Sequence, residues 1–353
     1  MDGVVSGTGG SAEQAAPETL SRLLEAVAAP RPDPIAPRPE DRALTLREIL
    51  APPRRIPGGL AARGLRRGDR LAVWLPAHPD YLLLCFAAWR LGVVVVSLNT
   101  RFRHAELDQV LAHQKPAAIA FGATGDSDSP TEILGQVSPD VLSSLRLLIP
   151  QSEDPARPFR APASLAAAEL APLGALETGP DLMEDLADPD APAVTFTTSG
   201  TTDRPKVVLH RQGSVARHAR DGARAYGFDA PGAVLLELMP LCGVYGFAQS
   251  LAAIAGGCPV ILMSQFEGAR AAALLREHGA THLLTTTEFL HPMLRAVPQA
   301  RPFPSLRLCV CVVFSPNPPG VLEEAAARGV PLHGGYGATE MQGVCLGQRL
   351  DAP

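Results

Sequence analysis

Short apolar runs alternate with amphipathic stretches along most of the chain from residue 70 onwards. The run at residues 93–98 is β-branched and almost continuously apolar, which is typical of a strand that is covered on both faces. The alternation of such strands with helices predicts an α/β fold, with a mostly parallel sheet and helices on both of its faces. The predicted strands are at residues 70–75, 93–98, 117–121, 145–149, 191–196, 207–210, 234–238, 259–263, 282–285, 306–313 and 331–333.

The predicted helices lie between these strands, and Ser214 is expected to be the N-cap of the third one. They are at residues 81–91, 105–113, 214–226, 247–255, 268–278, 288–296 and 319–327. Residues 122–190 are rich in proline, alanine and acidic residues, which indicates loops and a short helix around one strand. We therefore expect a disordered N-terminus at 1–18, a first α/β subdomain at 19–188 and a second at 189–353.

Composition excludes several classes of protein. The 353 residues are 46% hydrophobic and 19% charged, which is enough for a large core. A net charge of −5 without a basic cluster gives no electrostatic footprint for nucleic acid. No apolar run approaches the ~20 residues of a membrane span, and the N-terminus lacks a signal-peptide pattern. These features predict a reduced, cytoplasmic protein with no membrane partner.

The six cysteines lie mostly in apolar segments, where cysteine acts as a small hydrophobe. Cys309 and Cys311 alternate along a predicted strand and therefore face the same side. A metal site would need further ligands, and the sequence offers none nearby. We expect these two thiols to belong to the core.

A polar loop follows the apolar run at residues 191–196. Its hydroxyl groups and backbone N–H groups suit phosphate oxygens, and its lysine adds a compact positive charge. The residues expected to contact phosphate are Thr198, Ser199, Gly200, Thr201, Thr202 and Lys206. Lysine occurs at only one other position, Lys115, so its retention here is informative. The segment lacks the Gly-Lys-Ser/Thr ending of the common nucleotide P-loop.

Two further segments carry chemistry. Gly334-Gly335-Tyr336-Gly337-Ala338-Thr339-Glu340 follows the strand at 331–333, and its glycines suit close approach of backbone to a ligand. Between it and the first loop stands Leu238-Met239-Pro240-Leu241-Cys242-Gly243-Val244-Tyr245-Gly246. Taken alone, either segment is also compatible with an ordinary turn or pocket wall.

Together, and in this order, the three segments resemble the adenylate-forming superfamily of acyl-CoA synthetases, peptide-synthetase adenylation domains and luciferases. The first is similar to the family's Thr-Ser-Gly-Thr-Thr-Gly-x-Pro-Lys-Gly loop, except at Asp203 and Val207. The second is similar to its Tyr-Gly-x-Thr-Glu motif. The resemblance runs from about residue 44 to residue 349. It implies the N-terminal core of the adenylate-forming fold, with two mostly parallel sheets flanked by helices.

The resemblance also implies ATP and Mg²⁺ as cofactors. Lys206 and the hydroxyl loop would hold the β- and γ-phosphates, Thr339 would bind the α-phosphate, and Glu340 would ligate Mg²⁺. The adenine would contact Tyr336, Gly337 and Ser315. The substrate pocket would include Cys242, Gly243 and Tyr245, with Cys242 and Gly243 in place of the family's aromatic–histidine pair. A wall thiol is a better interpretation of Cys242 than a nucleophile, because no partner base is visible.

The family continues beyond the second motif to a Thr-Gly-Asp motif and a small C-terminal domain with a catalytic lysine. Neither is found in these 353 residues, so the C-terminal domain is expected to be missing here. The expected function is ATP-dependent activation of a small carboxylic acid as its acyl-adenylate, in incomplete form. Coenzyme A or a carrier-protein phosphopantetheine would be the acceptor, and a separate C-terminal domain could be a partner. The alternative is an inactive remnant that binds nucleotide or another protein.

Overall fold

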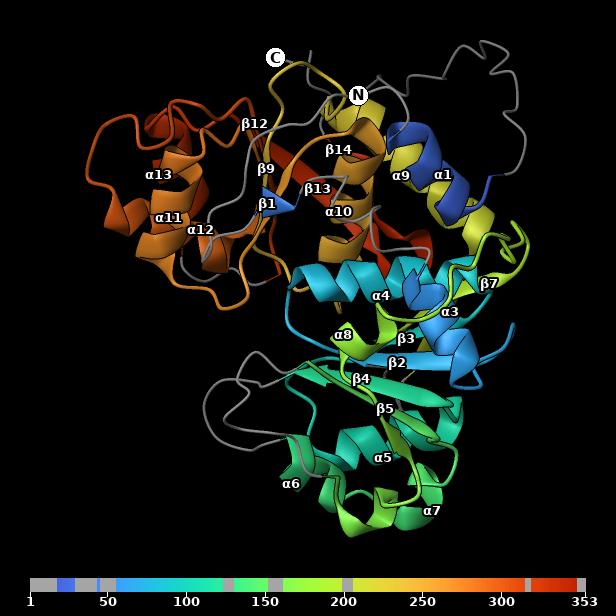
Figure 1. Cartoon of the computed structure of the whole chain (residues 1–353). Coiled ribbons are helices and arrows are strands. Elements are labelled where there is room, and N and C mark those ends of the chain that lie inside the picture. Colours follow the sequence, from blue (N-terminus) through green and yellow to red (C-terminus); the bar gives the residue numbers. More distant parts are fainter. Residues whose placement is uncertain are drawn as a thin grey trace, which may run out of the picture.

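Two seven-stranded sheets with helices on their faces make up the computed structural model (Figure 1). The structure describes residues 18–28, 43–44, 55–122, 130–151, 161–198, 206–314 and 319–347. The expected disordered N-terminus lies outside this range, apart from Glu18. Among the described residues, no helix has both the length and the apolar character needed to cross a bilayer.

The first sheet has the order β6-β5-β4-β2-β3-β7-β8. All neighbouring strands are parallel except β7 and β8, which form an antiparallel hairpin. The strands are β2 (Arg70–Trp74), β3 (Val94–Ser97), β4 (Ala118–Gly122), β5 (Leu147–Gln151), β6 (Glu169–Leu170), β7 (Pro192–Thr198) and β8 (Lys206–Arg211). Six of these seven strands confirm sequence predictions to within a few residues. The short edge strand β6 was not predicted.

The second sheet has the order β1-β10-β9-β11-β12-β13-β14 and is parallel except at its two ends. Its strands are β1 (Ala43–Leu44), β9 (Leu235–Glu237), β10 (Val260–Leu262), β11 (His282–Thr286), β12 (Leu308–Val312), β13 (Leu332–Ala338) and β14 (Gly343–Gly347). β13 is longer than predicted, because the glycine-rich motif continues the strand and pairs with β14. Neither β1 nor β14 was predicted.

The two sheets do not divide the sequence at residue 188. β7 and β8 come after this position, yet β7 pairs with β3 and both strands extend the first sheet. β1 comes from the N-terminal part and pairs with β10 of the second sheet. The hairpin that carries the phosphate loop is therefore built on the first sheet, while the glycine-rich motif is built on the second.

Helices and sheets alternate in layers. The α-helices are α1 (Leu20–Ala28), α3 (Arg55–Ala62), α4 (Pro79–Arg90), α5 (His104–Gln114), α6 (Pro130–Gly135), α7 (Pro139–Leu142), α8 (Leu173–Leu176), α9 (Gln212–Tyr226), α10 (Val244–Gly256), α11 (Gly268–Glu277), α12 (Thr287–Ala296) and α13 (Val321–Ala327). The 3-10 turns are η1 (Ala163–Leu165) and η2 (Thr339–Met341). Helices α5 to α7 cover one face of the first sheet, and α11 to α13 cover one face of the second (Figure 1).

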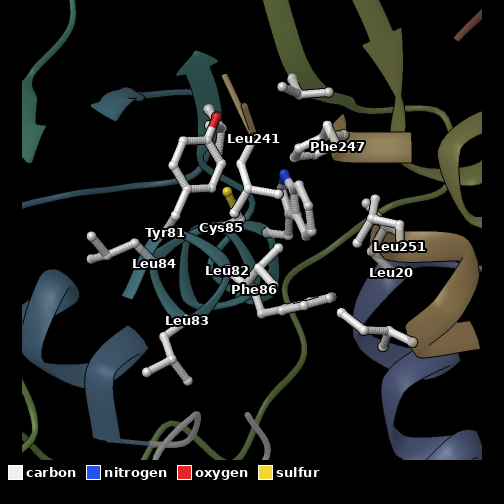
Figure 2. Packing of buried hydrophobic residues seen from close by; sticks show 14 of the residues in the cluster. Leu20, Tyr81, Leu82, Leu83, Leu84, Cys85, Phe86, Leu241, Phe247 and Leu251 are labelled. Carbon is white, nitrogen blue, oxygen red and sulfur yellow. The ribbon is translucent and has the colours of Figure 1, made fainter. Parts of the chain in front are cut away.

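The largest apolar cluster lies between the two sheets, around α4 and α10. Every residue of α4 from Tyr81 to Arg90 is buried, which explains why this stretch is apolar on all sides. Figure 2 shows Tyr81, Cys85 and Phe86 of α4 in the same cluster as Leu241 and Phe247. This layer fixes the position of one sheet relative to the other, and both carry parts of the candidate site.

Several helices begin a few residues away from their predicted N-termini, among them α10, which starts at Val244 and not at residue 247. α9 begins at Gln212 with Arg211 as its N-cap, so the prediction of Ser214 as N-cap is wrong. The Ser214 hydroxyl donates instead to the Arg211 carbonyl oxygen, at 2.9 Å. α1 was not predicted. It buries Leu20 and Leu23, and the adjacent Glu18 forms a two-pronged ion pair with Arg220 of α9 at 2.6 and 2.7 Å.

Candidate nucleotide-binding site

The phosphate-loop segment spans the turn of the β7–β8 hairpin. Thr198 lies directly opposite Lys206 in the antiparallel register, so both residues flank the turn. Lys206 is exposed and Thr198 is half-buried, and both are therefore open to a ligand. The loop residues Ser199, Gly200, Thr201, Thr202 and Asp203 lie outside the described residues. The hairpin holds the two ends of the loop together on the edge of the first sheet.

The second motif runs along β13, through the 3-10 turn η2 and into β14. Tyr336 is 65% exposed, Glu340 is exposed and Thr339 is half-buried. Gly337 has a structural reason to be glycine, because a Cβ atom there would collide with the carbonyl group of Gly343 on β14. The glycine at this position therefore permits the close approach of β14, whereas the sequence suggested close approach of a ligand.

The two motifs meet through His210, a residue of β8 that the sequence did not single out. Its Nε2–H group donates to the carbonyl oxygen of Thr339 in η2, at 2.9 Å. The side chain is only 6% exposed, and burial lowers the pKa of His210 below the usual value. The neighbouring Glu340 opposes this shift through its negative charge. A neutral imidazole thus ties the edge of the first sheet to the second motif.

The third segment adds the start of α10 to the same region. Gly243 is the N-cap of α10, and Gly343 at the start of β14 packs against the backbone of Val244 and Tyr245. The Tyr245 hydroxyl lies 3.4 Å from the Val310 carbonyl oxygen and 3.5 Å from that of Thr285. The Thr285 carbonyl group is one residue from the carboxyl end of β11, and that of Val310 lies in the middle of β12. Ligands of parallel α/β sheets bind beyond the carboxyl ends of the strands.

Cys242 is half-buried, and its carbonyl oxygen accepts a hydrogen bond from the Ser97 hydroxyl at 3.0 Å. The Ser97 hydroxyl lies 2.5 Å from the hydroxyl of Tyr81 in α4. Burial raises the pKa of the Cys242 thiol, so it stays protonated at neutral pH and is a weak nucleophile. The geometry favours a wall residue at this position.

A narrow cavity of about 10 Å³ lies behind the His210–Thr339 contact, between the first sheet, α9 and α10. It is lined mainly by apolar side chains, with His210, His218 and Gln342 as polar members. This volume suits about one water molecule. The cavity is far too small for a nucleotide.

Ser315, the weakest of the expected adenine contacts, lies outside the described residues, and the preceding Phe314 is 71% exposed. Among the described residues, no group of three or more His, Cys, Asp or Glu side chains is arranged to hold a metal ion. Glu340, the central residue of η2, instead presents a single exposed carboxylate. One carboxylate combined with substrate phosphates is a common way of binding Mg²⁺, so this residue fits such a role.

Beyond His210, the sequence analysis missed two buried polar residues near the site, Glu237 at the end of β9 and Gln249 in α10. Glu237 is the only charged residue in the apolar run at 234–238, and this contrast was the available signal. Gln249 interrupts the apolar helix α10. Its burial depends on how α10 packs, which the sequence pattern does not show.

The sequence matches the family described as AMP-binding enzyme over residues 24–353, which is most of the chain. The chain belongs to this AMP-binding enzyme family. Among curated proteins, it is 24% identical over 308 residues to a 2-succinylbenzoate–CoA ligase of Bacillus pumilus, covering 85% of this chain and 55% of that protein. The chain spans about half the length of the curated relatives that it matches.

Solved structures agree on the fold of this family member. A putative long-chain-fatty-acid CoA ligase from Rhodopseudomonas palustris superposes with a TM-score of 0.76 at 20% identity, over 94% of this chain and 79% of that one. The N-terminal domain of a Mycobacterium tuberculosis protein, solved with an inhibitor, gives a TM-score of 0.69 at 21% identity, over 92% and 77%. The two-sheet architecture is therefore that of the N-terminal domain of acyl-CoA ligases.

Proposed function

We propose that this chain is the adenylating core of an AMP-forming acid–thiol ligase. A carboxylate oxygen of a small acid would attack the α-phosphorus of ATP. The bond from this phosphorus to the bridging oxygen would break, and pyrophosphate would leave. The resulting acyl-adenylate would then pass its acyl group to a thiol, that of coenzyme A or of a carrier-protein phosphopantetheine.

The observation that supports this proposal most strongly is the contact between His210 and Thr339. It brings the phosphate-loop hairpin and the second motif, 129 residues apart, to one place on the surface. A triphosphate needs both at once, since the loop would bind the leaving pyrophosphate while Thr339 binds the α-phosphate. This arrangement supports an adenylating site in a member of the AMP-binding enzyme family.

The proposed roles follow the expected ones. Lys206 would balance the negative charge that builds on the departing pyrophosphate, together with the hydroxyl groups of Thr198, Ser199, Thr201 and Thr202 and the backbone of Gly200. Tyr336, Gly337 and Ser315 would contact the adenine, and the acid would lie near Cys242, Gly243 and Tyr245. Tyr336 is 65% exposed, and an aromatic ring at this position suits stacking against the base. Catalysis would rest on positioning and charge, with no protein nucleophile.

Glu340 is the residue that would hold Mg²⁺ through its carboxylate. The ion would supply charge neutralisation on the phosphates. His210 would keep η2 in place while Glu340 faces the ligand. Because burial keeps the imidazole neutral, His210 adds no positive charge that would compete with the ion.

The test is carboxylate-dependent exchange of pyrophosphate into ATP, with Mg²⁺ and a pooled panel of aryl, alkyl and amino acids. Lys206→Ala should abolish exchange, whereas Lys115→Ala should leave it unchanged. Lys115 is the only other lysine and is exposed at the end of α5, so it is a matched control. Direct binding of MgATP should be measured in parallel by calorimetry.

Two other outcomes would contradict the proposal in different ways. Binding of MgATP without exchange would show that this chain binds nucleotide but does not adenylate alone. Adding a separately produced C-terminal domain from a relative would then test whether the activity needs a second part. Absence of both binding and exchange would overturn the proposed function.

A further inference from the structure

The turn η2 is held from behind by polar contacts to which the proposed chemistry gives no role. The Thr339 carbonyl oxygen accepts from two donors, the Nε2–H group of His210 at 2.9 Å and the backbone N–H of Gln342 at 3.1 Å. The side chains of both donors, together with that of His218 on α9, line the narrow cavity between the first sheet, α9 and α10. Three polar side chains therefore border one small space behind the turn that carries Thr339 and Glu340.

Gln342 is an unexpected residue at its position. Its backbone is left-handed, with a φ of 65°, a conformation that favours glycine or asparagine. The side chain is half-buried, yet its Oε1 atom is buried and has no hydrogen-bond partner among the described residues. A buried acceptor without a donor destabilises a folded protein, so native structures normally supply a water or a ligand. Glycine would avoid both costs, and the presence of glutamine therefore indicates that its side chain is used.

The two histidines of the cavity offer complementary hydrogen-bonding atoms. Burial lowers the pKa of both His210 and His218, so each ring is neutral at neutral pH and carries a single N–H group. His210 donates its N–H group to Thr339, which leaves Nδ1 as an acceptor. His218 adds one N–H donor. The cavity therefore combines two acceptors, His210 Nδ1 and Gln342 Oε1, with one donor.

The cavity has room for one water molecule and little more. Its volume of about 10 Å³ matches a single water, and a buried water needs two to four polar partners. A water here would donate its two protons to Gln342 Oε1 and His210 Nδ1 and would accept from the His218 N–H group. The rest of the lining is apolar, including Phe247 and Leu251, so these three groups are the partners that the cavity offers.

We propose that one buried water joins Gln342 and His218 to His210, and that this linkage positions η2 for the nucleotide. The bonds close a ring that runs from the Thr339 carbonyl through His210, the water and the Gln342 side chain to the Gln342 backbone. Rotation of η2 would break at least one bond of this ring, so the ring fixes the orientation of Thr339 and Glu340. The inference rests on the proposed function, because it adds positioning residues to the same site.

The first test is Gln342→Met, which keeps the length of the side chain and the left-handed backbone but removes the acceptor. It should lower the melting temperature by about 1–2 °C and weaken the binding of MgATP about tenfold, as measured by calorimetry. Gln136→Met is the matched control. The exposed Gln136 also follows a helical turn, and its backbone N–H bonds to the carbonyl oxygen three residues earlier, at 3.1 Å. Neither quantity should change in this control.

Nitrogen-15 NMR of the histidine side chains adds a readout that a merely structural role would not move. His210 should be the Nε2–H tautomer, and its Nδ1 resonance should shift in Gln342→Met because the water is lost. His218→Leu removes the third partner, so it should give the same shift and the same loss of MgATP affinity, and it keeps the test available if Gln342→Met does not fold. Either His218→Asn or His218→Gln should restore both, because their amide nitrogens replace Nδ1 and Nε2 of the ring, respectively.

Several results would overturn the inference. A higher melting temperature of Gln342→Met would show that the cavity is dry, and an unchanged His210 resonance in both variants would exclude the water link. A shifted resonance with unchanged MgATP affinity would assign the water to the stability of the fold alone. If the wild-type chain binds no MgATP, the proposed function fails and the positioning role fails with it, whereas the melting temperatures and the NMR signals still show whether the water is present.

Discussion

The Nε2 atom of His210 lies 2.9 Å from the carbonyl oxygen of Thr339. His210 belongs to the last strand of the first sheet, and Thr339 to the turn that follows β13 of the second. Among the described residues, this hydrogen bond is a direct polar link between the two motifs that the sequence predicts to bind the nucleotide. It also orients η2, the turn that carries Glu340. A buried neutral histidine is suited to this role, because its ring is packed inside the protein while its Nε2–H group donates the hydrogen bond.

We expect His210→Ala to weaken both the fold and the site. It removes a buried hydrogen bond, while the Thr339 carbonyl oxygen keeps the backbone N–H of Gln342 at 3.1 Å, so the free energy of unfolding should fall by about 1 kcal/mol. Because His210 then no longer holds η2 in place, MgATP should bind about tenfold more weakly, in line with the loss of one hydrogen bond. Urea titration and calorimetry measure the two effects.

His113→Ala is the control for this variant. His113 is exposed near the end of α5 and far from the site in the fold, so neither stability nor binding should change appreciably. If His210→Ala lowered stability but left MgATP affinity intact, the hydrogen bond would serve the fold alone.

The same histidine should make stability depend on pH. Burial lowers the pKa of His210 below 6.5 in the folded state. As the pH falls through about 6.5, the unfolded chain takes up a proton that the folded chain does not, so the free energy of unfolding decreases until the folded pKa is reached. In His210→Gln this contribution is absent. The difference in melting temperature, variant minus wild type, should therefore increase as the pH is lowered from about 7.5 to about 5.5.

Glu237→Gln should show the opposite dependence on pH. Burial raises the pKa of Glu237, so above about pH 4.5 the folded chain holds a proton that the unfolded chain has released. The free energy of unfolding of wild type thus decreases as the pH rises toward the folded pKa, whereas glutamine does not titrate. The variant should be the more stable protein, with a gain that grows as the pH rises above about 5. A gain that is constant with pH would show that the carboxyl is ionised in the fold.

Gly337 and Gly334 provide a matched pair within one motif. A Cβ atom at Gly337 would collide with the backbone of Gly343, whereas one at Gly334 would meet no atom within 4 Å. Gly337→Ala should therefore separate β13 from β14 and cost about 3 kcal/mol or more, while Gly334→Ala should stay within about 1 kcal/mol of wild type. Thermal unfolding of both variants tests which of the two substitutions is the more destabilising. Equal effects would mean that β14 adjusts easily at this position.

Much of this architecture could be predicted from the sequence. Apolar β-branched runs such as residues 93–98 located most strands to within a few residues, because strands covered on both faces must be apolar throughout. The strands that were not predicted give weak signals, since β1 and β6 have two residues each and β14 begins and ends with glycine. Helices α1 and α3 were not predicted either, although they have nine and eight residues. Ser214 was a plausible N-cap by residue type, yet α9 starts two residues earlier because the chain leaves β8 directly into the helix.

The motifs of the site were visible in the sequence, but the residues that join them were not. Nothing local distinguishes His210 from any histidine at the end of a strand, since its partner Thr339 is 129 residues away. Burial of Gln249 likewise depends on which face of α10 meets the second sheet. Sequence patterns report the local period of burial, whereas these contacts depend on how distant elements pack.

The hydroxyl pair of Tyr81 and Ser97 offers a last test, because it connects the first sheet to the start of α10. Ser97 donates its single proton to the Cys242 carbonyl oxygen, so the Tyr81 hydroxyl must donate to Ser97. Ser97→Ala leaves two buried polar groups unpaired and should cost about 2–3 kcal/mol. Tyr81→Phe removes a donor while Ser97 keeps its bond to Cys242, and it should cost about 1 kcal/mol.

The exposed Ser143, which bonds only within its own turn, is the control, and Ser143→Ala should cost less than about 0.5 kcal/mol. A double variant of Tyr81 and Ser97 should cost less than the sum of the single ones, because the two share one interaction. If Tyr81→Phe proved the more costly change, the Ser97 hydroxyl would donate its proton to Tyr81 instead of to the Cys242 carbonyl. Cys242 would then be held chiefly by packing, and the start of α10 would not depend on the first sheet for a hydrogen bond.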